Sequence, residues 1–105
     1  MAGPQDLAAL LSRQIGKGNG VTASALAAAL GTTTRAVRHL VTELREEGTA
    51  VCGHPATGYF IAANSEELEA TCAFLRSRAM HSLKLESTLR HVPLTDLLGQ
   101  LRLKT

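Results

Sequence analysis

The stretch GTTTRAVRHLVTELREEG, residues 31–48, is the part of the chain from which the fold is best inferred. It starts with a glycine and three threonines and ends in a second glycine. At about 100° per residue, one side of a helix here contains only apolar side chains, namely Val37, Leu40, Val41 and Leu44. The opposite side contains Arg35, His39 and Thr42. The pattern predicts a helix with a buried back and a basic exposed side.

A second helix is expected directly before this one, in VTASALAAALG, residues 21–31. Thr22 can cap its start through the hydroxyl oxygen, and Gly31 can adopt the left-handed conformation just past its end. The following helix should begin at Thr33 or Thr34, so only two or three residues separate the two. Such a sharp turn requires the helices to share one core, which is typical of a helix-turn-helix motif.

The segments on either side of this pair are also predicted to be ordered. Leucines at helical spacing predict a first helix over residues 5–15, which the glycine-rich GKGNG then ends. Two short apolar runs, 50–52 and 59–62, flank the turn-forming GHPATG and predict a β-hairpin. One hairpin is only marginally stable alone, so we expect it to pack on the helices.

Two further helices are predicted after the hairpin. Asn64 or Ser65 can cap a fourth helix, whose apolar stripe contains Leu68, Cys72, Leu75, Ala79 and Leu83. Glu86 would fall in the middle of that stripe, so we expect a break or a change of packing near residues 82–86. A last short helix over residues 94–101 follows Pro93 and has an apolar face of its own.

Composition narrows the class of protein. The 105 residues suit one globular fold, 45% of them are apolar, and aromatic residues contribute only 3%, which favours helices over a large sheet. The net charge of +2 is too small to indicate a nucleic-acid partner by itself. Neither a signal peptide nor an apolar run long enough to span a bilayer is present, so we expect a cytoplasmic protein without membrane contact.

The order of these elements resembles a known family. Residues 21–62, VTASALAAALGTTTRAVRHLVTELREEGTAVCGHPATGYFIA, resemble the DNA-binding domain of biotin operon repressor-type regulators. Shared features are a helix of small residues, a glycine turn, a Ser/Thr cap, a Leu-Arg pair three residues before Gly48, and Gly-Tyr with a following aliphatic residue. The expected fold is mainly α with a small β-hairpin wing: a winged helix-turn-helix domain over residues 1–63 and a C-terminal helical extension over 64–105 that packs on this domain or mediates dimerisation.

The resemblance implies that residues 33–47 form a recognition helix in the major groove of double-stranded DNA. Arginine can pair bidentately with guanine, and threonine or histidine can reach bases or phosphates. The candidate DNA-binding residues are Thr33, Thr34, Arg35, Arg38, His39, Thr42, Arg45, Lys17 and His54. The wing departs from the family pattern, because its tip carries His54 but no lysine or arginine.

These features favour sequence-specific DNA binding by a small transcriptional regulator of bacterial or phage origin. The alternative is an accessory protein of replication, recombination or packaging that uses the winged helix for non-specific DNA or protein contacts. Catalytic motifs are missing, so we expect neither an enzyme nor a cofactor. A zinc site could recruit only Cys52, His54, Cys72 and His81, whose spacing lacks a metal-binding knuckle, and we expect no metal.

The apolar stripes after residue 64 exceed what a winged helix needs to cover. Regulators built on this motif are commonly symmetric, because two recognition helices one DNA turn apart strengthen binding. We therefore expect the C-terminal helices, over residues 65–101, to form a homodimer.

Overall fold

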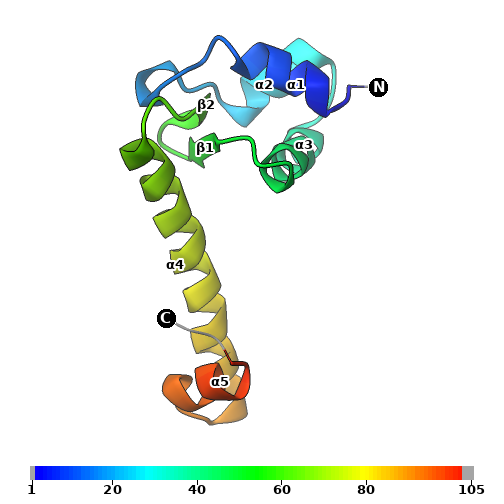
Figure 1. The fold of residues 1–105 in the computed structure, drawn as a ribbon. Coiled ribbons are helices and arrows are strands. Elements are labelled where there is room, and N and C mark those ends of the chain that lie inside the picture. Colours follow the sequence, from blue (N-terminus) through cyan, green and yellow to red (C-terminus); the bar gives the residue numbers. More distant parts are fainter. Residues whose placement is uncertain (1, 103–105) are drawn as a thin grey trace. The chain divides into compact units, whose positions relative to one another are not determined.

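The computed structural model describes residues 2–102 (Figure 1). The elements within that range are, in chain order, α1 (Pro4–Leu11), the 3₁₀ turn η1 (Lys17–Asn19), α2 (Ala23–Leu30), α3 (Thr34–Glu46), β1 (Val51–His54), β2 (Gly58–Ile61), α4 (Ser65–Arg90) and α5 (Leu94–Gln100). The expected fold class is confirmed: the chain is mainly α, and one small antiparallel hairpin follows three N-terminal helices and precedes the C-terminal ones. This order is compatible with a winged helix.

The chain divides into two compact units, of which the first ends at Thr71 and the second begins at Cys72. The first contains α1, α2, α3, the hairpin and about two turns of α4. The second contains the rest of α4 and α5. The first turns of α4 belong to the first unit because they pack on the hairpin.

The turn between α2 and α3 forms as the sequence predicts. The Thr22 hydroxyl accepts a hydrogen bond from the backbone N–H of Ala25 at 3.1 Å. Gly31 adopts the left-handed conformation at φ 67°, and the N–H of Thr32 bonds back to the carbonyl of Ala27. The Thr33 hydroxyl then caps α3 by accepting from the N–H of Ala36 at 3.1 Å. Both ends of this short connection are therefore closed by hydrogen bonds.

The core of the first unit lies between α1, α2, α3 and β1. Its buried members are Leu7, Leu11, Leu26, Ala27, Val37, Leu40, Val41, Leu44 and Val51. Burying each large side chain of this kind contributes about 1.5–3 kcal/mol, so the cluster is the main source of stability for the unit. The predicted stripe of α3 supplies four of the nine members, which confirms the helical phase inferred from the sequence.

The two faces of the hairpin pack against different partners. Val51 belongs to the core cluster, whereas Cys52 and Phe60, which pair with each other across the strands, point to the other face and are also buried. The Cys52 thiol lies 3.6 Å from the carbonyl oxygen of Glu67, and Thr71 is buried as well. The start of α4 therefore covers the face of the hairpin that is turned away from the core.

The first helix is shorter than predicted, since α1 ends at Leu11 and the next residues run along β2 instead. The N–H of Gly16 donates to the carbonyl of Ile61, and the N–H of Ile61 donates to the carbonyl of Gln14, both at 2.8 Å. Val21 and Tyr59 exchange two backbone hydrogen bonds, at 2.8 and 2.7 Å. The segment that precedes α2 thus pairs with the second edge of β2.

This pairing brings two backbones too close for any side chain at two glycines. A Cβ atom on Gly20 would overlap the carbonyl oxygen of Thr57, and one on Gly58 would lie 2.7 Å from the backbone of Val21. Gly58 also has φ at +71°, which favours glycine. Both positions therefore require glycine for steric reasons.

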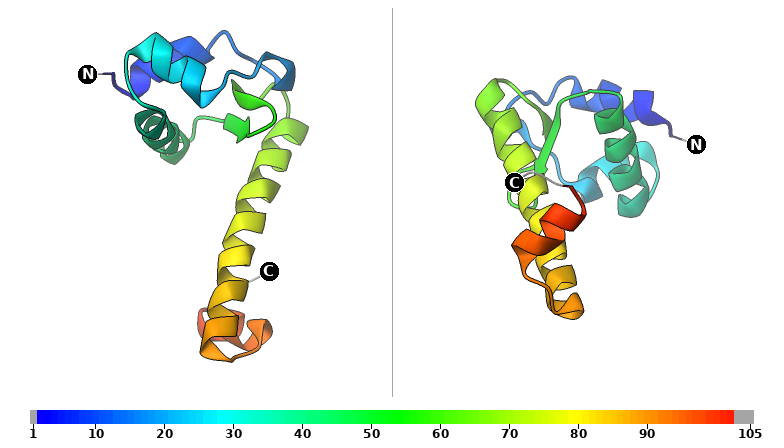
Figure 2. Two further views of the ribbon diagram at one scale, coloured as in Figure 1. Left: turned by 180° about the vertical axis from the view of Figure 1, so that it is seen from behind. Right: turned by 60° about the horizontal axis from the view of Figure 1, so that its bottom comes forward.

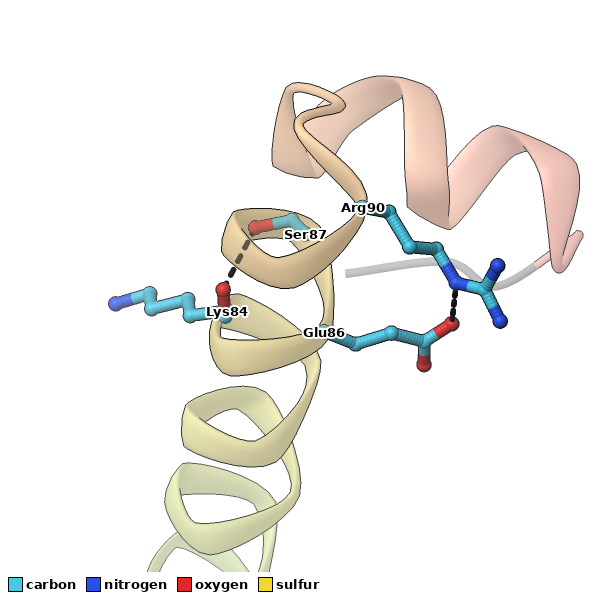
Figure 3. A network of polar contacts seen from close by, with 4 residues as sticks. All are labelled: Lys84, Glu86, Ser87 and Arg90. Carbon is cyan, nitrogen blue, oxygen red and sulfur yellow. Dashed lines mark hydrogen bonds and ion pairs between the residues drawn. The ribbon is translucent and has the colours of Figure 1, made fainter.

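Of the two alternatives expected near residues 82–86, a break does not occur, because α4 continues without interruption to Arg90. The packing does change: Ala79 is exposed, Leu83 is half-buried and Ser87 is buried. No glycine or proline occurs between Gly58 and Pro93. Glu86 does not disrupt the helix, since its Oε2 accepts a hydrogen bond from Arg90 Nε at 2.7 Å, one turn further on (Figure 3). The Ser87 hydroxyl bonds to the carbonyl of Lys84 at 2.7 Å, also within the helix (Figure 3).

The second unit is a helical hairpin. His91 ends α4 in a positive-φ conformation at 56°, and Pro93 precedes α5. Helix α5 then turns back beside the end of α4 (Figure 2). Its Leu97 and Leu98 are buried. Within residues 2–102, no helix is long and apolar enough to cross a membrane.

Replacing Gly20 with Ala should destabilise the first unit by at least about 2 kcal/mol, because the new methyl group overlaps the backbone of Thr57. Gly18→Ala is the matched control: nothing lies within 4 Å of a Cβ atom there, so we expect a change within about 0.5 kcal/mol. Urea unfolding of both variants measures the difference. Equal stabilities of the two would contradict the close crossing of the backbones.

Candidate nucleic-acid interface

The exposed side of α3 presents four of the predicted site residues together. Arg35, Arg38, His39 and Thr42 are all exposed, whereas the opposite stripe of the same helix is buried. At about 100° per residue these four side chains occupy one third of the helix circumference. We call this set the α3 front. It has the dimensions of a single helix face, which is what the major groove of DNA admits.

Arg35 and Arg38 are the principal charges of the α3 front. Among residues 2–102 the ion pairs are His39–Glu43 and Arg90–Glu86, so neither arginine is neutralised by an acidic neighbour. Within the same range, no side-chain hydrogen bond holds either guanidinium. Both retain the full set of donors that bidentate contact with guanine or phosphate uses.

His39 is oriented by an acidic residue on its own helix. Its Nε2 lies 2.9 Å from Oε1 of Glu43, one turn further along, and 74% of the His39 side chain is exposed. Glu43 thus partly offsets positive charge at the edge of the α3 front, and Glu46 and Glu47 add negative charge in the last turn.

The threonines have local structural roles in addition to the predicted ones. The Thr33 oxygen caps α3, which leaves its hydroxyl proton available for a phosphate at the helix start. Thr34 is half-buried. The Thr42 hydroxyl donates to the carbonyl of Arg38 at 3.1 Å and keeps only acceptor capacity towards the outside.

Arg45 is directed to the hairpin. Its Nε donates to the carbonyl oxygen of Val51 at 2.8 Å, and the residue is half-buried. A Cβ atom on Gly53 would lie 3.5 Å from Nη2 of Arg45 and 2.6 Å from the Tyr59 ring, so arginine and tyrosine both cover this glycine. Arg45 therefore links α3 to β1, and its Nε is not available to a ligand.

His54 lies at the end of β1, where the hairpin turns. Its Nδ1 accepts a hydrogen bond from the N–H of Ala56 at 3.1 Å, and its carbonyl accepts one from Thr57 at 3.0 Å. The side chain is exposed. The hydrogen bonds of His54 thus stabilise the turn of the hairpin. Residues 54–57 contain no lysine or arginine that could add positive charge.

Lys17 is exposed in η1, a turn that is tied to the start of α4. Its backbone N–H donates to Oε2 of Glu67 at 3.0 Å, while Oε1 of the same carboxylate accepts from Ala63 at 2.8 Å. The N–H of Glu67 in turn bonds to Oδ1 of Asn64 at 2.9 Å, which confirms Asn64 as the cap of α4. Sequence reasoning missed this role of Glu67, although the Asn-x-x-Glu spacing resembles a capping box.

The hydrogen bonds from Ala63 and, to a smaller extent, Lys17 hold the pKa of the Glu67 carboxyl below its ordinary value. A lowered pKa in the folded state means that the ionised carboxylate stabilises the fold. That stabilisation is complete above the pKa of the unfolded chain and is lost as the pH falls through the lowered pKa.

The cysteines and histidines are not gathered into a metal site. Cys52 is buried and Cys72 is exposed, and both are free thiols. In the described part of the chain, no three residues among His, Cys, Asp and Glu are close enough to hold a metal ion.

Comparison of this chain with protein-family models, with curated proteins and with solved structures found no match. The candidate interface is therefore defined by the residues of this chain alone.

Glu67→Gln should reduce stability at neutral pH and have a progressively smaller effect below about pH 4, where the wild-type carboxylate becomes protonated. Thermal unfolding of both proteins across this range gives the comparison. Glu66→Gln removes the same charge from the adjacent position, where no such tertiary hydrogen bond exists, and should not reproduce the pH dependence. A pH-independent effect of Glu67→Gln would show that the two hydrogen bonds do not favour the ionised form.

Proposed function

We propose that this protein binds double-stranded DNA in a sequence-specific manner and acts as a small transcriptional regulator. In this proposal the first unit is a winged helix-turn-helix domain of the biotin operon repressor type, and α3 is its recognition helix. The observation that carries the proposal is the pair Arg35 and Arg38, exposed and without acidic partners on a helix whose back is buried.

The geometry supports this function because α3 is both rigid and accessible. Its buried stripe fixes its rotation in the unit, and the bond from Arg45 to Val51 fixes its C-terminal end against the hairpin. The helix backbone that carries the α3 front therefore does not have to reorganise on binding DNA. The exposed guanidinium groups are then ordered by the bases or phosphates that they contact.

An accessory role in replication, recombination or packaging is the second candidate. Two observations favour it: the hairpin tip lacks a basic side chain, and Glu46 and Glu47 follow the α3 front in the last turn of the helix. Both reduce the electrostatic attraction for DNA. Binding in this case would depend on salt but not on the base sequence, or it would be directed to a protein.

Selection of binding sites from random duplexes, followed by affinity measurements over a range of salt concentrations, separates the two candidates. A recovered sequence motif with a large preference over random duplex supports the regulator. Salt-sensitive binding with equal affinity for all duplexes supports the accessory role, and no binding at all excludes both DNA-based readings.

Arg38→Ala should weaken binding to the selected duplex by about 1–3 kcal/mol, or roughly 5- to 150-fold, if the guanidinium reads a base. Arg35→Ala should also weaken binding. Arg13→Ala is the matched control, because Arg13 is an exposed arginine in the turn after α1. If both α3 variants remain folded and bind as tightly as the wild type, α3 is not the recognition helix.

We also propose that the protein is a homodimer through its C-terminal helices. In support, leucines on α4 and just after α5 are exposed: Leu68, Leu75, Leu85, Leu89 and Leu101. Sedimentation at increasing concentration should show a shift from the monomer mass to twice that mass. A monomer at every concentration up to the millimolar range would contradict this part of the proposal.

A further inference from the structure

One face of α4 has the spacing of a coiled-coil seam. Leu68, Cys72, Leu75 and Ala79 follow one another at alternating intervals of four and three residues, and all four are exposed. Because α4 is one uninterrupted helix, they share a face by helix geometry alone. We call these four residues the α4 seam; it is about 16 Å long.

The seam is bounded towards the C-terminus by polar residues. The same alternating spacing leads from Ala79 to Ser82 and Glu86, and the Glu86 carboxylate is engaged by Arg90 (Figure 3). The positions of the seam itself are therefore apolar from Leu68 to Ala79 and polar beyond it. The C-terminal part of α4 contributes a separate face, whose Ser87 is buried in the second unit.

Side-chain sizes alternate along the seam in an order that fits its own reverse. When two such helices run antiparallel, Leu68 lies opposite the partner's Ala79 and Cys72 lies opposite the partner's Leu75, so each layer contains one leucine and one small residue. Interdigitation of large and small side chains keeps two helices evenly spaced. A parallel pair would instead alternate wide layers of two leucines with narrow layers of two small residues.

The charged residues beside the seam are also complementary to each other when the second helix runs in the opposite direction. Glu69 and Arg76 are exposed, lie seven residues apart on one flank and are too far apart to pair within a single helix. In the antiparallel arrangement Glu69 lies opposite the partner's Arg76, and the reciprocal pair forms at the other end. On the other flank, Arg78 lies over its own Phe74 ring, 5.9 Å from the centroid. A parallel arrangement would place this flank of one helix beside the other flank of its partner, so Glu69 would not meet the partner's Arg76.

We propose that α4 pairs antiparallel with α4 of a second copy of this chain, with the seams in contact and Glu69 opposite the partner's Arg76. The inference rests on the homodimer proposed above and specifies its surface and orientation. A second copy is the occupant because both the size order and the charge order of the seam are complementary to themselves.

Cysteine cross-linking tests the orientation. In a Cys72→Ala background, the Leu68→Cys and Ala79→Cys proteins are mixed and oxidised, and the cross-linked products are identified by mass spectrometry. The background protein alone is the control, since its remaining Cys52 is buried. A predominant bond between positions 68 and 79 is expected. Predominance of 68–68 and 79–79 products, or no cross-link, would overturn the proposal.

Charge reversal gives a second test that leaves the apolar contacts intact. Glu69→Arg and Arg76→Glu should each raise the dimer dissociation constant roughly tenfold, because each creates two repulsive pairs per dimer. The double variant should restore dimerisation. Glu66→Arg changes the charge equally on the opposite face of α4 and should have little effect. Failure of the double variant to recover would overturn the predicted pairing.

The outcome for the dimer is separate from that for DNA. A protein that binds a selected duplex through Arg38 but sediments as a monomer leaves the DNA-binding function in place and excludes the antiparallel pair. An antiparallel dimer without affinity for any duplex supports the pairing of the α4 helices and excludes the DNA-binding function.

Discussion

The burial of one side of α3 against α1 and α2 is the contact on which the other features depend. The core contains four residues from one side of this helix, Val37, Leu40, Val41 and Leu44. Because helix geometry fixes the positions of the other side chains relative to these four, their burial determines which side chains of α3 reach solvent. The Gly31 turn brings α2 into position for this contact, and Arg45 secures the far end of α3 to the hairpin. The exposure of the two α3 arginines is thus a consequence of core packing.

Local sequence patterns were sufficient to predict the parts of the fold that depend on local contacts. The caps at Thr22 and Thr33, the left-handed Gly31 and the buried stripe of α3 each involve residues a few positions apart. The early end of α1 and the pairing of Val21 with Tyr59 could not be predicted in this way, because a pairing of single residues far apart in sequence has no periodic signature. Of the break or change of packing expected in α4, the break does not occur, because the segment contains no helix-breaking residue.

The residues of the candidate site likewise fall into those that local patterns predict and those that depend on tertiary contacts. Exposure of Arg35, Arg38, His39 and Thr42 follows from helical phase and was predictable. The engagement of Arg45 by Val51 and of Lys17 by Glu67 depends on tertiary contacts across the unit, which no local pattern indicates. Positive charge consequently concentrates in the first turns of α3 rather than extending over the hairpin. Binding energy from electrostatics would be modest, and shape and base contacts would have to supply more of it.

The close crossing at Gly20 and Gly58 restricts how this fold can vary. Val21 and Tyr59 are joined there by two backbone hydrogen bonds. A shift of either segment, or a residue inserted between the crossing and the core, would therefore break both bonds. Residues 54–56 lie beyond it and are exposed. Within the hairpin, insertions can therefore be accommodated at this loop, so the reach of the hairpin can change in evolution and in engineering while the paired backbone at the crossing stays constant.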